Sequence, residues 1–345
     1  MSDPATPSEQ RSDHGPEQLE ASVLEQIASA AKAKAPDFYI VGHPKCGTTA
    51  LYEMLRAQPG VFMPDRKEPG FFSTDLRYSA AQAGSGREPE SYAEYLSLFA
   101  GAAPGQLAGE ASTSYIWSRT APSLIAAARP DARVIDIVRD PAALLRSLHM
   151  QLLENRSEDV TSLREALELQ EERRAGRSLT RLAARRPQAL MYTDRVHYGE
   201  QLRRYREFFA AEQVLVLVYD DFRRDNEGTM RTVQRFLGLD DTLPFKSSEA
   251  NPTTRRRVGV DEMVRRVTTG ESLSARLVRG AARTVPRSVR RGALAQVERR
   301  VVFAKPRPPD EELMLELRRR FAGEVRALSE YLGRDLVAEW GYDAL

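Results

Sequence analysis

Residues 38–56 read Phe38-Tyr39-Ile40-Val41-Gly42-His43-Pro44-Lys45-Cys46-Gly47-Thr48-Thr49-Ala50-Leu51-Tyr52-Glu53-Met54-Leu55-Arg56. The apolar run at the beginning has the length of a strand and stops at Gly42, and Thr48 or Thr49 opens a helix with apolar residues at helical spacing. The backbone N–H groups of such a turn and the positive end of the helix dipole both point at an anion. The segment therefore predicts a phosphate-binding turn between a strand and a helix.

The turn is related to the phosphate-binding loop of nucleoside triphosphatases, Gly-x-x-x-x-Gly-Lys-Ser/Thr, but differs from it in one position. Gly42, Gly47 and Thr49 fit the pattern, whereas Thr48 stands at the lysine position and Lys45 lies inside the turn. A lysine there would reach the terminal group of a nucleotide from another side. The alternative interpretation is an ordinary turn of an α/β domain with an incidental lysine.

Length and composition limit the classes of protein to which this chain can belong. The 345 residues suffice for one large α/β domain or two smaller ones, and contents of 41% apolar and 29% charged residues are ordinary for a soluble globular protein. The net charge of +2 gives no indication of a nucleic-acid partner. Cys46 is the one cysteine and the four histidines have no metal-ligand spacing, so we expect neither a disulfide framework nor a metal site.

Targeting signals are missing from the sequence. No apolar run reaches the roughly 18 residues of a membrane span, and the N-terminus lacks the hydrophobic region of a signal peptide. We therefore expect no membrane span and, by default, a cytoplasmic protein. Residues 1–20 are polar and residues 21–34 carry a thin apolar stripe, so residues 1–35 are predicted to be a disordered or loosely helical leader. Residues 36–345 would form a single domain.

The rest of the chain alternates between strand and helix patterns. The predicted strands after the first are 61–63, 106–111, 133–138 and 214–219, and the predicted helices are 91–99, 142–155, 194–210, 226–238 and 309–332. The alternation predicts an α/β fold, a single P-loop-like domain whose mostly parallel central sheet is flanked by helices and followed by C-terminal helices. Residues from about 156 to 193 are rich in Arg and Glu, which indicates a helical insertion with a solvated, charged surface.

A second anion-directed element follows the buried strand at 133–138. Arg139 stands at the carboxyl end of this strand, Asp140 is a candidate helix N-cap, and Pro141 suits the first helical position. Ligands bind at that edge of an open α/β sheet, and an arginine offers a planar fork to phosphate or carboxylate. A structural salt bridge of Arg139 is the alternative. An ATP site would instead require an acidic residue for Mg²⁺ after such a strand. The arginine at this position therefore favours an anionic donor molecule that is bound without a metal.

Two further segments carry candidate residues. Glu68 lies in a proline-punctuated loop before Phe71 and Phe72, which we expect to anchor the loop in the core. A lone glutamate in such a loop is otherwise a solvated surface residue. Residues 255–257 are three arginines in a loop that we expect near the same edge of the sheet.

Together these motifs resemble those of the sulfotransferases that use 3′-phosphoadenosine 5′-phosphosulfate (PAPS). Pro44-Lys45-Cys46-Gly47-Thr48-Thr49-Ala50-Leu51 resembles their 5′-phosphosulfate loop, and Arg139-Asp140-Pro141 followed by Ser147 resembles their 3′-phosphate element. Lys67-Glu68-Pro69-Gly70-Phe71-Phe72 is similar to the segment that supplies the catalytic glutamate in Golgi carbohydrate sulfotransferases, particularly those of the heparan sulfate type. Gly109-Glu110-Ala111-Ser112 and Tyr198-Gly199-Glu200-Gln201-Leu202 also fit the family's order, and the resemblance covers roughly residues 38–260.

The resemblance implies transfer of a sulfuryl group from PAPS to a hydroxyl, or as a second choice an amine, of a saccharide or small-molecule acceptor. The product 3′-phosphoadenosine 5′-phosphate (PAP) would leave, and no metal would take part. Glu68 would be the catalytic base, ranked above His43, and Lys45 would stabilise the leaving phosphate. The donor-binding residues that the resemblance implies are Lys45, Cys46, Gly47, Thr48, Thr49, Ala50, Arg139, Ser147, Arg255, Arg256 and Arg257.

Two departures from the family pattern bear on substrate and location. Ala111 stands where heparan-type enzymes often have a lysine, which argues against a heparan-like substrate. The sequence shows no membrane anchor like that of Golgi members, which suggests a soluble bacterial-type member.

Two other functions stay open. One is a P-loop-type small-molecule kinase that uses ATP and Mg²⁺. The other is a non-catalytic module that binds an anionic partner through the basic residues 279–307. The acceptor and the oligomeric state also stay open.

Overall fold

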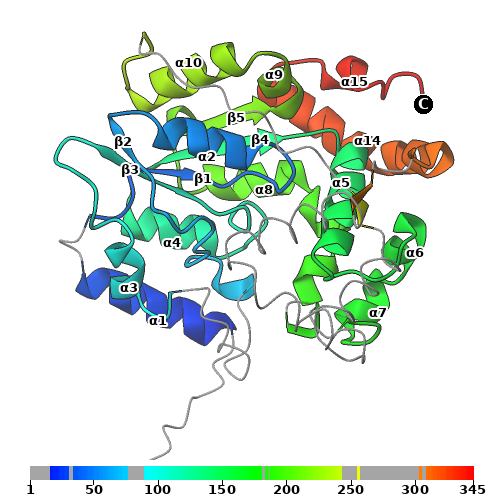
Figure 1. Ribbon diagram of the computed structural model, residues 1–345, viewed down its shortest axis with the longest axis horizontal. Helices are drawn as coiled ribbons and strands as arrows, with labels where there is room; N and C mark the ends of the chain where they lie inside the picture. The colour runs from blue at the N-terminus through cyan, green and yellow to red at the C-terminus, as the bar shows by residue number, and fades with distance from the viewer. Residues whose placement is uncertain are drawn as a thin grey trace, which may run out of the picture.

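The computed structural model describes residues 16–30, 34–76, 89–180, 183–185, 187–242, 255–256, 303–304 and 308–345. Its centre is a sheet of five parallel strands in the order β2-β3-β1-β4-β5 (Figure 1). The strands are β1 (Phe38–Ile40), β2 (Val61–Phe62), β3 (Leu107–Ala111), β4 (Arg133–Val138) and β5 (Val214–Val218). The predicted α/β class with a parallel sheet is confirmed.

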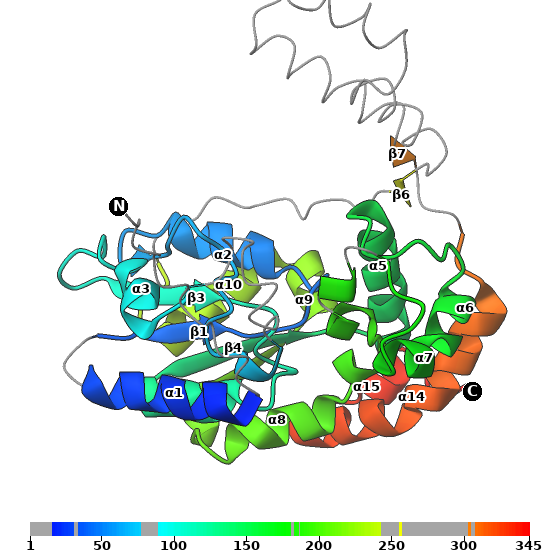
Figure 2. The ribbon, with the colours of Figure 1, turned by 90° about the horizontal axis from the view of Figure 1, so that it is seen from below.

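Helices cover both faces of the sheet (Figure 2). One hydrophobic core holds apolar residues of α2 (Thr48–Arg56), α5 (Pro141–Glu154), α10 (Asn226–Leu237) and α14 (Glu311–Leu332). A second core holds those of α1 (Pro16–Ser29), α3 (Tyr92–Ser97) and α4 (Ala121–Ala128). Tyr39 belongs to the second core and Ile40 to the first, because successive side chains of a strand point to opposite faces.

The remaining elements are short. The helices are α6 (Leu163–Glu168), α7 (Gln170–Arg174), α8 (Tyr198–Arg206), α9 (Tyr219–Arg224) and α15 (Leu336–Glu339), with 3₁₀ turns at Thr74–Leu76, Ala183–Arg185, Pro187–Leu190, Thr193–Arg195 and Ala211–Gln213. An antiparallel pair, β6 (Arg255–Arg256) and β7 (Phe303–Ala304), forms a second small sheet, and β6 lies beside α5 (Figure 2). In the described part of the chain, no helix combines the length and the apolar character that crossing a membrane requires.

The strand order brings the carboxyl ends of three strands side by side. Ile40, the last residue of β1, pairs with Ala111 of β3 on one side and with Ile135 of β4 on the other. The chain passes from β3 to β4 across β1, so the winding of the sheet reverses at β1. Ligands of open α/β sheets bind outside the carboxyl ends of the strands at such a switch point. The segments that carry Lys45 and Arg139 follow β1 and β4 at this edge.

Two helix boundaries follow local sequence signals. The Asp140 carboxylate caps α5 by accepting the N–H of Ala143 at 2.6 Å, and Pro141 is the first helical residue, as predicted. α10 ends at Gly238, which has a φ of 70°. This left-handed conformation carries no steric cost for glycine, and the predicted helix over 226–238 ends there.

The N-terminal helix α1 is more ordered than the sequence suggests. It begins at Pro16, inside the segment that was predicted to be a disordered or loosely helical leader, and residues 1–15 lie outside the described residues. Val23 and Ile27 are buried in the second core, where α1 packs beside α3 and α4. The Gln26 side-chain oxygen also accepts the backbone N–H of Tyr92 at 2.8 Å. A few well-placed side chains therefore dock this helix although its apolar stripe is thin.

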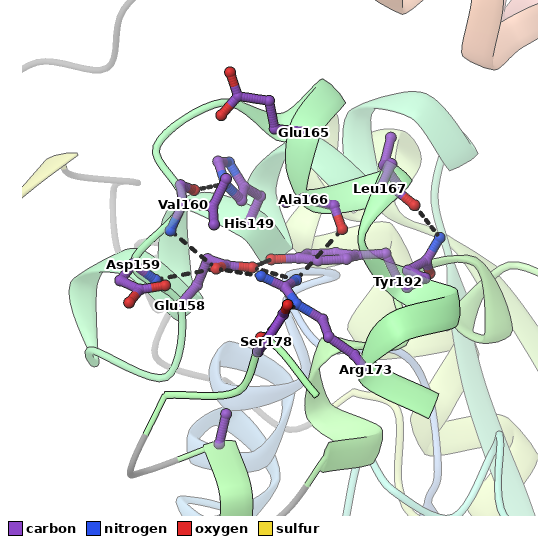
Figure 3. A network of polar contacts seen from close by, with 12 residues as sticks. His149, Glu158, Asp159, Val160, Glu165, Ala166, Leu167, Arg173, Ser178 and Tyr192 are labelled. Atoms are coloured by element: carbon purple, nitrogen blue, oxygen red, sulfur yellow. Dashed lines mark hydrogen bonds and ion pairs between the residues drawn. The ribbon is translucent and has the colours of Figure 1, made fainter. Parts of the chain in front are cut away.

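The insertion after α5 contains a buried ion pair, which differs from the solvated surface that its charges suggested (Figure 3). Two guanidinium nitrogens of Arg173 lie 2.8 Å from the two carboxylate oxygens of Glu158, and the two side chains are 1% and 0% exposed. Tyr192 and the backbone N–H of Val160 also donate hydrogen bonds to Glu158. His149 of α5 lies 2.8 Å from the carbonyl of Val160. The network thus satisfies both buried charges and ties the insertion to α5.

Candidate functional site

The turn between β1 and α2 has the backbone geometry of an anion site. Lys45 and Gly47 have φ values of 66° and 87°, and Gly47 is the N-cap of α2 without a side-chain cap. The first N–H groups of α2 are therefore not satisfied by a capping side chain, and they point out of the helix with the positive end of its dipole. Thr48 is buried and Thr49 is exposed at the beginning of the helix.

Gly42 lets the turn pack directly on β4. A Cβ atom at this position would lie 2.4 Å from the backbone nitrogen of Ile137, a distance that no side chain tolerates. The close approach holds the turn against the carboxyl half of β4, next to the segment that carries Arg139. Packing on β4 therefore requires glycine at position 42, and so does the phosphate-binding-loop pattern.

Arg139 contacts the turn directly. Its Nη1 donates to the carbonyl of Lys45 at 3.0 Å, its guanidinium lies 4.5 Å from the ring centre of Tyr219, and its own carbonyl accepts the hydroxyl of Tyr198 at 2.6 Å. Among the described residues, no carboxylate pairs with Arg139, so the structural salt bridge considered above is not found there. The guanidinium is held in place by a carbonyl and an aromatic ring, and its charge is available to an anion.

Lys45 stands in a partly buried and cationic environment. Burial lowers the pKa of the Lys45 ammonium, Glu154 at the end of α5 opposes this shift, and the neighbouring Arg139 adds to it. An anion placed here would relieve the repulsion between Lys45 and Arg139 and would favour the charged form of the lysine. Both cations therefore favour a bound anion at the carboxyl edge of β1 and β4.

Ser147 lies in the second turn of α5 and is buried, and its hydroxyl has no hydrogen-bond partner among the described residues. A buried hydroxyl without a partner is costly, so an oxygen of a ligand is a fitting acceptor for it. Strand β6 brings the backbone of Arg255 and Arg256 beside α5, while Arg257 lies outside the described residues.

Glu68 lies in a loop beside the carboxyl end of β3. Its backbone has a φ of 58°, its N–H donates to the carbonyl of Ala111 at 2.9 Å, and its side chain is half exposed. Lys67 Nζ lies 2.6 Å from its carboxylate. Phe71 and Phe72 are fully buried, which confirms the prediction that they anchor this loop in the core.

The side chains of His43 and Cys46 in the turn are fully buried. Burial lowers the pKa of His43 to about 3 with help from the charge of Arg195, so this fully buried ring is neutral and does not compete with Glu68 as a base that solvent can reach. Burial raises the pKa of the Cys46 thiol, and Sγ contacts the carbonyl of Pro44 at 3.6 Å. Cys46 is thus a small buried residue that fits the turn.

Sequence reasoning missed the tyrosines that fix Arg139. Tyr219 begins α9 directly after β5, and Tyr198 begins α8. Tyr198 occurs in a segment that fits the family's order, but its hydrogen bond to the carbonyl of Arg139 has no local sequence signal. Within the described ranges, no group of His, Cys, Asp or Glu side chains is arranged to hold a metal ion.

A cleft of about 590 Å³ lies away from this site, beside β5 and α10 and near the end of α14. Three of its charged lining residues pair with each other, since Asp221 contacts both Arg224 and Arg334. Lys45, Glu68 and Arg139 do not line this cleft, so the cleft is not the candidate site.

Asp136 of β4 is a buried carboxyl near Gly42, and burial raises its pKa from 3.8 to about 7. The folded chain therefore keeps a proton that the unfolded chain releases, so this contribution to stability is complete below pH 3.8 and is lost as the pH rises through about 7. We expect Asp136→Asn to raise the free energy of unfolding relative to wild type on the order of 2–4 kcal/mol near pH 8 but little near pH 4. Thermal unfolding of both proteins across this range measures the difference, and a pH-independent difference would contradict the assignment.

Comparisons with known proteins agree with this geometry. A family model described as "Sulfotransferase domain" matches residues 35–257. Carbohydrate sulfotransferase 15 of Mus musculus is 30% identical over 277 residues, which cover 64% of this chain and 47% of that protein. Heparan sulfate glucosamine 3-O-sulfotransferase 3B1 of Mus musculus is 30% identical over 227 residues, which cover 66% and 52%. The chain thus spans about half the length of the curated relatives it matches.

Solved structures support the fold. The crystal structure of a sulfotransferase from Alicyclobacillus acidocaldarius superposes with a TM-score of 0.63 at 24% sequence identity, and the match covers 88% of this chain and 98% of that chain. At this level of identity the similarity establishes the shared fold and says nothing about the roles of single residues.

Proposed function

Because this chain belongs to the sulfotransferase family, we propose that it transfers a sulfuryl group from PAPS to a hydroxyl of an acceptor molecule. The contact between Arg139 and the turn that carries Lys45 is the main support for this proposal. It joins two cations and an uncapped helix N-terminus at one edge of the sheet. A nucleotide with phosphates at both its 3′ and 5′ positions needs such an arrangement of separate cationic groups.

In the proposed donor complex, the N-terminus of α2 and the hydroxyls of Thr48 and Thr49 hold the 5′-phosphosulfate. Arg139 and Ser147 hold the 3′-phosphate, with help from arginines of residues 255–257. Lys45 stabilises the charge that grows on the oxygen between sulfur and phosphorus. Cationic side chains thereby supply the charge stabilisation that Mg²⁺ supplies in kinases.

In the proposed reaction, the acceptor hydroxyl attacks sulfur in line with the bond to the leaving phosphate. A new bond forms between sulfur and the acceptor oxygen, the bond between sulfur and the bridging oxygen breaks, and PAP leaves with the electron pair of that bond. Glu68 takes the hydroxyl proton, so the carboxylate is neutralised as the leaving phosphate gains charge. The half-exposed side chain of Glu68 supports this role, because an acceptor can reach it from solvent.

We propose a saccharide hydroxyl as the acceptor, with a small-molecule hydroxyl or an amine as the second choice. The two relatives are named as sulfotransferases of a carbohydrate and of heparan sulfate glucosamine, which supports the saccharide. Ala111, adjacent to Glu68 in space, argues for a saccharide other than heparan sulfate.

A thermal-shift comparison of PAP, ATP with Mg²⁺ and an oligonucleotide tests the proposed function against the kinase and the anion-binding module. We expect PAP at about 100 times its Kd to stabilise the protein by about 2.7 kcal/mol in the presence of EDTA. ATP with Mg²⁺ and the oligonucleotide should stabilise it less. Stabilisation by ATP with Mg²⁺ but not by PAP would support the kinase and contradict the proposal.

Arg139→Ala is expected to weaken PAP binding by about 10–100-fold, because charge-assisted hydrogen bonds contribute about 1.5–3 kcal/mol. Arg129→Ala is the matched control, because Arg129 pairs with Asp37 at the opposite, amino edge of the sheet. Calorimetric titration with PAP measures both affinities. Equal affinities of Arg139→Ala and wild type would rule out Arg139 as a phosphate ligand.

A further inference from the structure

A fully buried carboxylate stands at the carboxyl end of β3, next to the loop of Glu68. Glu110 accepts hydrogen bonds from the hydroxyls of Tyr95 at 2.5 Å, Ser112 at 2.5 Å and Tyr115 at 3.1 Å. Its side chain is 0% exposed, so no acceptor or donor molecule reaches it. The reaction proposed above leaves these four residues without a role.

Two of the three hydroxyls also bind the backbone of the loop. Ser112 Oγ accepts the N–H of Gly70 at 3.0 Å, and Tyr115 Oη accepts the N–H of Phe72 at 3.3 Å. The N–H of Glu68 is bound to the carbonyl of Ala111, which lies between Glu110 and Ser112 in sequence. Every second N–H of the loop, at residues 68, 70 and 72, is therefore bound to the segment that follows Glu110.

The carboxylate determines which way these hydroxyls point. An ionised carboxylate accepts but never donates, so Ser112 and Tyr115 must direct their single protons at Glu110. Their lone pairs are then left for the N–H groups of Gly70 and Phe72. An amide in place of the carboxylate also donates, so at least one hydroxyl would have to turn round and lose its contact with the loop.

The loop needs this support because Glu68 has an unfavourable backbone. A φ of 58° is uncommon for a residue with a side chain and persists only where the surroundings enforce it. The N–H contacts at 68, 70 and 72 and the buried rings of Phe71 and Phe72 supply that enforcement. Since a small displacement of a catalytic group costs much of its effect, the loop geometry decides how well Glu68 meets a hydroxyl.

We propose that Glu110 is a positioning residue for Glu68, acting through the hydroxyls of Ser112 and Tyr115 on the backbone of residues 68–72. This inference rests on the proposed role of Glu68 as the base. It assigns no contact with substrate to Glu110. It also explains why the Gly109-Glu110-Ala111-Ser112 segment accompanies the glutamate loop in this chain, although the two segments are about 40 residues apart.

The first test measures the loop itself, by amide hydrogen exchange of the full chain. The assay runs near pH 8, since burial raises the pKa of Glu110 to about 7 and the ionised form must prevail. Glu110→Gln should raise the exchange rate of the peptide that spans residues 68–72 by about 10-fold or more. Asp37→Asn is the matched control, because Asp37 accepts the N–H of Ala108 at the amino end of the same strand, at 2.8 Å. It should leave exchange at 68–72 unchanged.

The second test measures turnover of radiolabelled PAPS with unsulfated chondroitin, a saccharide other than heparan sulfate, in wild type, Glu110→Gln, Glu68→Gln and the double variant. We expect Glu110→Gln to lower kcat by about 10–100-fold with PAP affinity unchanged, and the double variant to equal Glu68→Gln within about twofold. Effects that multiply in the double variant, or unchanged exchange at 68–72, would overturn the inference. A wild type that neither shows turnover nor is stabilised by PAP would instead overturn the proposed function, and the exchange measurement would still decide whether Glu110 orders the loop.

Discussion

Glu68→Gln is expected to lower kcat by about 10²–10⁴-fold, the range that a positioned general base contributes. Glutamine keeps the size of the side chain and one acceptor oxygen, but it cannot take the proton of the acceptor hydroxyl. Because the Glu68 side chain is half exposed and forms no part of either hydrophobic core, the variant should fold as the wild type does. Initial rates at saturating PAPS and acceptor measure the effect.

Donor binding separates this loss from a general disturbance of the site. PAP affinity of Glu68→Gln should match that of wild type, since Glu68 contacts the acceptor side in the proposed reaction. Glu94→Gln is a suitable control, because Glu94 is another exposed carboxylate near the beginning of α3. Near-normal turnover of Glu68→Gln would show that another group, or the acceptor itself, provides the base.

Lys45→Met is expected to lower kcat by about 10²–10³-fold, the effect of removing one preorganised group that stabilises developing charge. Methionine keeps an unbranched apolar side chain in the half-buried turn and removes the ammonium. The loss should exceed the loss of PAP affinity, because charge on the bridging oxygen is greater in the transition state than in the bound donor.

Lys34→Met is the control for this prediction. Lys34 pairs with Asp37 at the amino edge of the sheet, and its side chain is largely exposed. It should leave both kcat and PAP affinity within about twofold of wild type. If Lys45→Met raised the KM for PAPS and left kcat intact, Lys45 would bind the ground state only, and its proposed role in the transition state would be wrong.

Local patterns predicted the elements that depend on neighbouring residues. The β-branched run of β4, the Asp140 and Pro141 start of α5 and the Gly238 end of α10 are all as predicted. Each depends on contacts within a few residues, which a sequence displays directly. The turn at residues 42–47 was also predicted from its pattern. The positive φ of Gly47 is a local feature, whereas the close packing of Gly42 on Ile137 is a long-range contact.

Long-range contacts explain the elements that were not predicted. The strand predicted over 214–219 ends at Val218, and Tyr219, Asp220 and Asp221 lie in helix α9. The indole N–H of Trp340 donates to Asp220 at 3.1 Å, and Arg334 pairs with Asp221. These partners are more than 100 residues away in the sequence, so no local window contains the signal. The buried pair of Glu158 and Arg173 likewise cannot be told from solvated charges by spacing alone.

For the site, the sequence indicated candidate residues at strand ends but not the side chains that support them. Lys45 and Arg139 were placed at strand ends by pattern, and the structure finds them in contact at one edge of the sheet. The orienting contacts of Tyr198 and Tyr219, and the hydroxyl network around Glu110, depend on the tertiary fold. Arg257 and the basic residues 279–307 lie outside the described residues, so their roles stay predictions.

A crystal structure of the chain with bound PAP would locate both phosphates of the nucleotide. We expect the 5′-phosphate on the turn of residues 42–49, the 3′-phosphate within hydrogen-bond distance of Arg139 and Ser147, and Glu68 facing the 5′ end of the nucleotide. Density for PAP in the cleft beside β5 and α10, with the turn empty, would contradict this expectation.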